Sequence, residues 1–154
     1  MIAGYYPLGE EIWNQTNGEV DAFVQCVGTS ASSQGVATVL KRYNPKLKSI
    51  VVEPGESAVL SGGQPGAHDI EGIGVGFTPP LWDPSMVDEI IAVSTADAEA
   101  MTRRLVREEG LFAGTSSGAN VVVAIRVAEQ LGPDASIVTV DYSLKHLSTD
   151  VRRK

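Results

Sequence analysis

Cysteine, histidine and basic side chains are all scarce in this sequence. The single cysteine among 154 residues, Cys26, excludes an internal disulfide and suits a reducing compartment. One cysteine and two histidines, without HxxH or CxxC spacing, give no pattern for a metal site. The formal net charge is −7, whereas binding to nucleic acid or an anionic membrane requires clustered Lys and Arg. We therefore expect no metal, no nucleic acid and no membrane partner.

Long hydrophobic runs are also missing. Arg126 interrupts the longest apolar stretch, so no segment is long enough to cross a membrane. The opening residues MIAGY lack the basic start and apolar run of a signal peptide. The composition, 43% hydrophobic and 20% charged, is that of a globular protein. We expect a cytoplasmic protein with residues 1–154 in a single domain.

Short apolar segments alternate with amphipathic ones along the chain. The periodicity predicts strands at 20–27, 49–52, 89–93 and 137–140, and helices at 10–15, 35–43, 94–109 and 114–131. Such alternation predicts an α/β fold, a three-layer α/β/α sandwich with a mostly parallel, Rossmann-like sheet of about four strands. Residues 55–84, rich in Gly and Pro, form a long loop of the kind that is usually functional or interface-forming.

A turn of small residues, CVGTSASSQG over 26–35, lies between the first strand and its helix. The N–H groups at a helix start and the helix dipole favour a phosphate there, and the hydroxyls of Thr29, Ser30, Ser32 and Ser33 add donors. The alternative is a turn that is rich in Gly and Ser only because it must turn and cap the helix.

Seven segments, in order, carry a resemblance to a known family. They are GEEIWNQT at 9–16, VGT at 27–29 with Gly35-Val36, VEP at 52–54 with Ser57 and then LSGG at 60–63, IEGIGVGF at 70–77, REEGL at 107–111, GTSSGA at 114–119 and LSTD at 147–150. Nearly end to end, the chain resembles the C-terminal half of the pyridoxal-phosphate (PLP) dependent cysteine synthase and cystathionine β-synthase family, the fold type II, tryptophan synthase β-like enzymes.

The resemblance implies PLP as cofactor and a place in amino-acid metabolism, the replacement of the β-substituent of an O-activated serine in cysteine biosynthesis. The family's phosphate loop, Gly-Thr-Gly-Gly-Thr, corresponds to Gly28, Thr29, Ser30, Ala31 and Ser32, so two glycines are replaced by Ser30 and Ala31. Serine and alanine adopt positive φ less easily than glycine does.

Two further cofactor contacts follow from the resemblance. Gly72 belongs to the glycine-rich segment that lines the cofactor cleft. In the family, a Ser or Thr hydroxyl after an Asp near the C-terminus contacts the pyridine nitrogen of PLP. Here Tyr142 follows Asp141 at that position, and the Ser143 hydroxyl is the expected substitute for this contact. Tyr142 is expected to crowd the ring site.

The family's PLP-binding lysine and its substrate-carboxylate loop lie in the N-terminal half, before the first residue of this sequence. Lys41, Lys46, Lys48 and Lys145 have no matching context. We therefore expect no catalytic residue in this chain and no family reaction by it alone.

Three functions remain open: part of a cysteine synthase-like enzyme completed by an N-terminal half, a non-catalytic phosphate- or anion-binding module, and a truncated relic without a specific ligand. An uncovered cleft face and sheet edge predict a homodimer, or pairing with the missing half.

Other reactive side chains receive structural interpretations. His68 is expected to be structural or to lie at the cleft edge. Ser116 and Ser117 are expected to cap a helix or to contact the cofactor cleft, and Cys26 to be inert packing.

Overall fold

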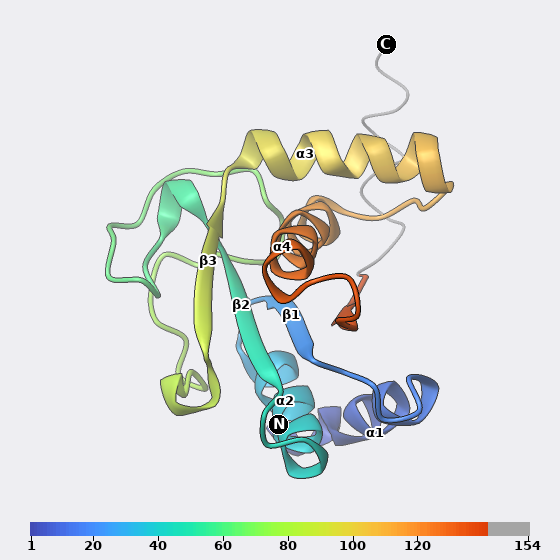
Figure 1. Ribbon diagram of the computed structural model, residues 1–154. Helices are drawn as coiled ribbons and strands as arrows, with labels where there is room; N and C mark the ends of the chain where they lie inside the picture. Colours follow the sequence, from blue (N-terminus) through green and yellow to red (C-terminus); the bar gives the residue numbers. More distant parts are fainter. Residues whose placement is uncertain (142–154) are drawn as a thin grey trace.

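The computed structural model describes residues 1–141, which form a four-stranded sheet with helices on both faces (Figure 1). The strands are β1 (Ala22–Cys26), β2 (Lys48–Pro54), β3 (Glu89–Val93) and β4 (Ile137–Thr139). Their order is β3-β2-β1-β4, and every pairing is parallel. The α/β sandwich that the sequence predicts is confirmed, and the described sheet is parallel throughout.

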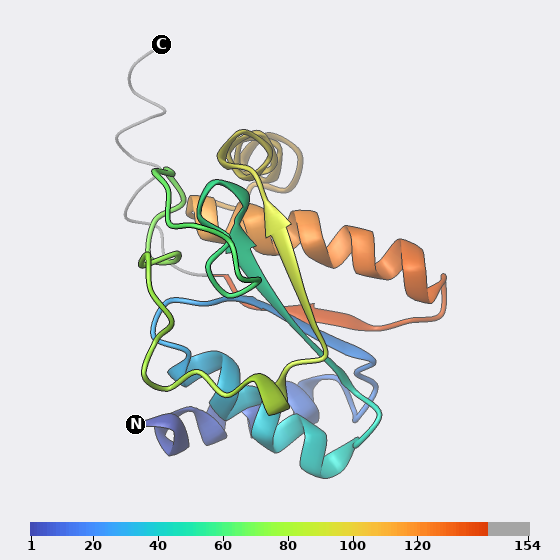
Figure 2. The ribbon, with the colours of Figure 1, turned by 90° about the vertical axis from the view of Figure 1, so that its left-hand side faces the viewer.

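The helices lie in layers on either side of this sheet. They are α1 (Tyr6–Gln15), α2 (Ala31–Tyr43), α3 (Thr95–Arg104) and α4 (Thr115–Leu131), with short turns η1 (Ile2–Tyr5), η2 (Gly55–Ser57) and η3 (Pro84–Met86) and a π-helical turn, η4 (Leu105–Glu109). Figure 2 shows α1 and α2 on one face and α4 on the other, with α3 packed against α4. Within residues 1–141, no helix combines the length and apolar character needed to cross a membrane.

Two helices begin earlier than the sequence analysis predicts. Helix α1 starts at Tyr6, not at residue 10, with a proline in its first turn, where the missing N–H costs nothing. Helix α2 starts at Ala31, so Gly35 lies inside it. A Cβ on Gly35 would lie 2.6 Å from the carbonyl oxygen of Ile2, so this glycine permits close packing between helices. The prediction that this helix starts at Gly35 was wrong, because the glycine serves helix packing and does not mark a helix end.

The core follows from the alternation of side chains along β1. Ala22, Val24 and Cys26 belong to the cluster that includes α4, and Phe23 belongs to the cluster that includes α1 and α2. All four side chains are buried. Both faces of β1 are therefore covered, as expected for a central strand of a parallel sheet.

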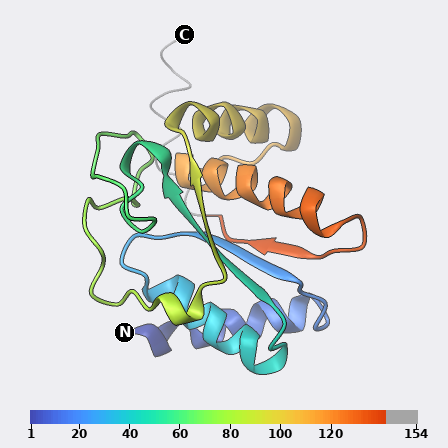
Figure 3. The ribbon, with the colours of Figure 1, turned by 60° about the vertical axis from the view of Figure 1, so that its left-hand side comes forward.

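The chain reverses its direction of travel across the sheet at β1. From β1 it passes through α2 to β2 and then to β3, whereas α3 and α4 return it to β4 on the opposite side of β1. Because the connections after β1 and before β4 lie on opposite faces, a crevice opens at the carboxyl ends of these neighbouring strands. Figure 3 shows the long loops between β2 and β3 gathered at this edge.

Helix α3 begins at the cap that the sequence predicts. The Ser94 hydroxyl oxygen accepts a hydrogen bond from the Asp97 N–H at 3.1 Å. This bond satisfies one of the N–H groups that the first helical turn leaves unpaired. The connection from β3 into α3 is thus determined locally.

Candidate functional site

A cavity of about 350 Å³ lies at the carboxyl end of β1. It is lined by residues from three segments that are distant in sequence: the turn after β1, a glycine-rich segment before β3, and the start of α4. The lining residues are Cys26, Gly28, Thr29, Ser32, Glu71, Gly72, Ile73, Gly114, Thr115 and Ser116. Its volume is within the range of about 300–1,000 Å³ typical of small-molecule pockets.

Two helices direct their N-termini at this cavity. Helix α2 begins beside Thr29 and Ser32, and α4 begins beside Gly114 and Thr115. Each N-terminus presents backbone N–H groups and partial positive charge. None of the lining residues is Lys or Arg, and Glu71 contributes a carboxylate. Attraction for an anion therefore comes from the two helices rather than from a basic side chain.

The first two walls meet at Gly28. A Cβ on this residue would lie 2.5 Å from the carbonyl oxygen of Gly72, a distance that real Cβ atoms do not reach. Only glycine allows the two backbones to approach so closely. Gly28 thus joins the turn after β1 to the glycine-rich segment.

Ser30 has a left-handed backbone conformation although it is not a glycine. Its φ is 73°, and Ala31 follows as the first residue of α2. The Ser30 side chain is buried, and its hydroxyl has no hydrogen-bond partner among the described residues. A serine in this conformation stores backbone strain.

Hydroxyl groups of the turn form local hydrogen bonds. Thr29 Oγ1 accepts from the Ala31 N–H at 3.4 Å, and Ser32 Oγ accepts from Gln25 Nε2 at 2.6 Å. Gln25 is a buried residue of β1. The side chain of Ser32 is therefore oriented by the sheet.

Side chains at the starts of α3 and α4 hold the glycine-rich segment. Thr115 Oγ1 accepts from the Glu71 N–H at 3.1 Å and donates to the Asp69 carbonyl at 3.3 Å. The Asp69 N–H donates to Thr95 Oγ1 at 3.2 Å. The wall that carries Gly72 is thus bound to two helix starts.

The Asn120 side chain of α4 bridges the chain at the carboxyl ends of β1 and β4. Its Oδ1 accepts from the Cys26 N–H at 2.7 Å, and its Nδ2 donates to the Val140 carbonyl at 2.9 Å. Asn120 is completely buried. The sequence analysis missed this residue; the available signal was one amide within the apolar run ANVVVA.

Cys26 lines the cavity as a neutral thiol. Its Sγ donates to the Ser116 carbonyl at 3.4 Å, and the side chain is buried. Burial raises the pKa of the Cys26 thiol far above its ordinary value. A nucleophilic thiolate is disfavoured, in agreement with the prediction of inert packing.

Ser116 and Ser117 do not cap α4, so the capping interpretation was wrong. The N-cap is Gly114, without a side-chain hydrogen bond. Ser116 lines the cavity, and Ser117 Oγ donates to Asp141 Oδ1 at 2.6 Å. Ser117 thus connects α4 to the residue that follows β4.

The structure brings part of the predicted cofactor set together. Gly28, Thr29, Ser32 and Gly72 line the cavity, whereas Ser30 and Ala31 shape the turn without lining it. Ser143, with Tyr142, lies outside the described residues. The prediction left out the lining residues Glu71, Ile73, Gly114 and Thr115, although all four belong to the motifs at 70–77 and 114–119.

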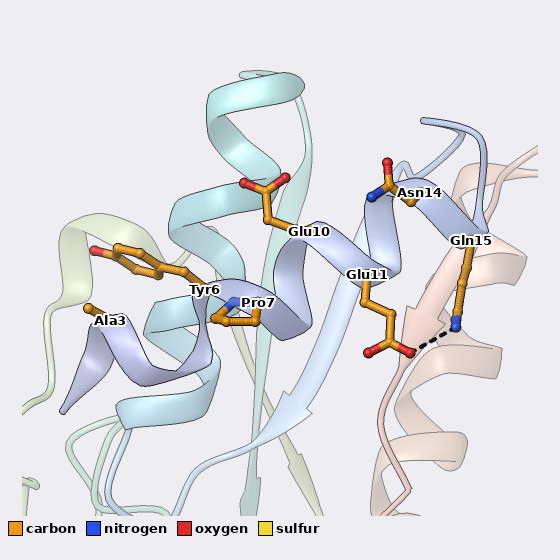
Figure 4. Close-up of a pocket in the computed structure, with 7 residues that line it drawn as sticks. All are labelled: Ala3, Tyr6, Pro7, Glu10, Glu11, Asn14 and Gln15. Carbon is orange, nitrogen blue, oxygen red and sulfur yellow. Dashed lines mark hydrogen bonds between the residues drawn. The ribbon is translucent and has the colours of Figure 1, made fainter.

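A larger, shallow hollow of about 740 Å³ lies along α1 (Figure 4). Hydrogen bonds already engage three of its polar side chains: Gln15 Nε2 donates to Glu11 at 3.0 Å, and the Tyr43 hydroxyl donates to Glu10 at 2.6 Å. Its lining comes only from η1 and α1. No separate segments converge there, so we do not treat it as the functional site.

Metal ligands do not gather in the part of the chain that the structure describes. No group of three or more His, Cys, Asp or Glu side chains is placed there to hold a metal ion.

Known proteins resemble this chain in both sequence and fold. The family model described as "Pyridoxal-phosphate dependent enzyme" matches residues 1–141. A cysteine synthase of Staphylococcus aureus is 43% identical over 133 residues, which are 86% of this chain and 43% of that protein. The O-acetylserine sulfhydrylase isoform 3 of Entamoeba histolytica superposes with a TM-score of 0.93 at 39% identity, over 99% of this chain and 47% of that one.

A third relative is the O-acetylserine dependent cystathionine β-synthase of Helicobacter pylori. It has a TM-score of 0.87 and 35% identity, over 94% of this chain and 47% of that one. The chain therefore spans less than half the length of these relatives.

Proposed function

Because this chain belongs to the pyridoxal-phosphate dependent enzyme family, we propose that its cavity binds the phosphate end of PLP. We propose further that the chain acts as the C-terminal part of a cysteine synthase-like enzyme. The observation that carries the proposal is the convergence of the α2 and α4 N-termini on one cavity at the crevice beside β1. An anion is the ligand that two such termini favour.

The residues present fit a phosphate group. The contact between Gly28 and Gly72 leaves backbone, not side chains, at the junction of the two walls. Thr29 and Ser32 add hydroxyl groups beside the first turn of α2. Gly28, Thr29 and Ser32 would hold the phosphate, and Gly72 would border the ring.

PLP, when bound, supplies an electron sink for reactions at the α-carbon of an amino acid. The residues of this chain bind and orient the cofactor and exclude water from one side of it. No lysine lines the cavity within residues 1–141. Lys145 lies outside the described residues and has no matching sequence context. We therefore propose that another chain supplies the lysine which the reaction needs, and that this chain alone is inactive.

The test is a titration of the chain with PLP and, separately, with inorganic phosphate. Binding is followed by tryptophan fluorescence and by the melting temperature. We expect both ligands to raise the melting temperature and phosphate to compete with PLP. Borohydride reduction followed by mass spectrometry should find no lysine specifically modified. Specific modification of one lysine would overturn the proposal of an external lysine.

The absence of a cavity lysine favours a second candidate, a non-catalytic module that binds phosphate or a small anion. Assay of the chain mixed with the N-terminal half of a related cysteine synthase separates the two. Recovery of activity supports the enzyme part. Phosphate binding without any recovery supports the module. If neither phosphate nor PLP binds, both fail and the chain is a relic without this ligand.

We also propose that the face around the cavity is covered by a partner, either a missing N-terminal half or, in the chain alone, a second copy. Exposed apolar side chains close in sequence to the lining residues support this: Phe77 is 59% exposed and Phe112 is 50% exposed. Exposed apolar side chains near one site indicate an interface.

A cytoplasmic location is part of the proposal. Its support is the single cysteine, because a chain with one buried thiol and no disulfide suits a reducing compartment.

A further inference from the structure

The glycine-rich wall of the cavity needs an anchor. Gly72, Gly74 and Gly76 all have positive φ, at 79°, 60° and 80°. Glycine backbone has more accessible conformations than any other, so a segment with three such residues is not rigid by itself. Whatever restrains this segment also places Gly72 against Gly28.

His68 supplies that restraint with both ring nitrogens. The Ile70 N–H donates to Nδ1 at 3.2 Å, which requires Nδ1 to be an acceptor without a proton. The ring proton is then on Nε2, which donates to the Gly74 carbonyl at 3.0 Å. A neutral ring in this tautomer therefore joins residues on both sides of Gly72.

Packing leaves Gly74 little room to move away from the ring. A Cβ on Gly74 would lie 2.6 Å from His68 Nε2 and 2.5 Å from Pro54 Cγ. The Gly74 N–H donates to the Val27 carbonyl at 3.4 Å. Because Val27 directly precedes Gly28, this bond connects the anchored segment to the turn after β1.

We propose that His68 is a positioning residue of the cofactor site, holding Gly72 against Gly28 so that the cavity keeps its shape. The inference rests on the proposed function. His68 acts through the backbone, since it does not line the cavity itself. The family resemblance left this histidine with only a general structural role.

Three substitutions separate the two ring bonds. In His68→Asn the side-chain oxygen accepts from the N–H two residues on and replaces only the Ile70 bond. In His68→Gln the longer side chain reaches Gly74 with an N–H donor. His68→Ala removes both bonds. Gln64→Ala, an exposed change in the same loop, is the control.

The readout is PLP affinity by fluorescence titration at neutral pH. We expect His68→Ala to weaken binding about five- to tenfold, with smaller losses in His68→Asn and His68→Gln. The Gln64→Ala control should follow the wild type.

A measurement without ligand distinguishes failure of this inference from failure of the proposed function. Long-range proton–nitrogen NMR should show the His68 ring protonated on Nε2 alone, with the Ile70 amide protected from exchange. If the wild type binds PLP and all three His68 variants bind equally well, the inference is overturned and the proposed function stands. If the wild type does not bind PLP, the proposed function and this role of His68 both fail. The NMR data then still show whether the His68 ring makes its two hydrogen bonds.

Discussion

Ser30 carries the most strained conformation in the turn at the cavity. A non-glycine residue at a φ of 73° costs about 1–3 kcal/mol, and a buried hydroxyl without a partner adds to that cost. Two hydrogen bonds to the Ser30 carbonyl hold this residue in place. Ser33 Oγ donates to the Ser30 carbonyl, and the Gln34 N–H donates to the same oxygen at 3.0 Å.

Ser30→Gly should raise the free energy of unfolding by about 1 kcal/mol, because glycine adopts positive φ without strain. Urea denaturation measures the change. Ser30→Ala is the matched control, since it removes the hydroxyl and keeps the Cβ. Equal stabilisation by both variants would assign the cost to the buried hydroxyl instead of the backbone.

Gly28→Ala should lower the free energy of unfolding by about 1–3 kcal/mol, because its Cβ would collide with the Gly72 carbonyl and separate the two walls. PLP affinity should fall with it. Thermal denaturation and fluorescence titration measure the two effects. Gly4→Ala makes the same change where a Cβ would meet nothing within 4 Å, and it should leave both unchanged. Unaltered PLP binding by Gly28→Ala would contradict the role of this contact.

At the scale of elements, single polar side chains connect the ends of strands to helices. Asn120 connects the ends of β1 and β4 to α4, and Asp88 connects β2 to α2. Such residues occupy positions where a parallel sheet leaves backbone groups unpaired.

Asn120→Ala should lower the free energy of unfolding by about 2–4 kcal/mol, because two buried backbone groups lose their hydrogen-bond partners. Chemical denaturation measures the loss. Asn14→Ala, an exposed change on α1, serves as the control and should be near neutral. A loss below about 0.5 kcal/mol for Asn120→Ala would show that water replaces the amide.

Asp88 makes the stability of the fold pH-dependent. Burial alone raises the pKa of its carboxyl, but the Lys41 ammonium at 2.6 Å and the Ser49 N–H at 2.7 Å outweigh burial and lower the pKa below its ordinary value. A carboxyl whose pKa is lowered in the folded state stabilises the fold above the unfolded value, near pH 3.9, and this stabilisation is lost as the pH falls through the folded value.

Asp88→Asn should therefore be less stable than the wild type at neutral pH, with the difference shrinking in acid. Urea denaturation from about pH 7 to about pH 2 measures both curves. Asp134→Asn, an exposed change, should follow the wild-type curve. A constant difference between wild type and Asp88→Asn at every pH would contradict the ion pair as its source.

At the scale of the whole molecule, no strand within residues 1–141 extends the sheet beyond β3 or β4. Strands β3 and β4 form the two edges of the described sheet. Val75, Phe77, Leu111 and Phe112 are exposed and lie within four positions of cavity-lining residues in the sequence. Edges and apolar patches of this kind favour association.

Light scattering of the isolated chain should therefore report a homodimer. Phe77→Asp should shift the population toward monomer, because it places a charge at an exposed apolar position of the glycine-rich segment. The control, Leu131→Asp, is at the other end of α4, about 25 Å from its start, and should remain dimeric. A monodisperse monomer of the wild-type chain would contradict the expected dimer.

Much of the architecture is encoded locally. Apolar runs placed all four strands, the Ser94 cap located α3, and the small-residue turn located one wall of the cavity. These features depend on residues a few positions apart, whose periodicity and hydrogen-bonding chemistry can be read directly from the chain. The same local signals, with the ordered motifs, were enough to identify the family.

Only the tertiary structure decided how these parts meet. The bond from Asn120 to Cys26 joins residues 94 positions apart, and the Thr115 bond to Glu71 joins residues 44 apart. No periodicity encodes such pairs, because they form only after the parallel strands bring separate loops to one edge. The sequence by itself determined which elements form and which family they belong to; folding determined that two helix starts and a glycine-rich wall enclose one cavity.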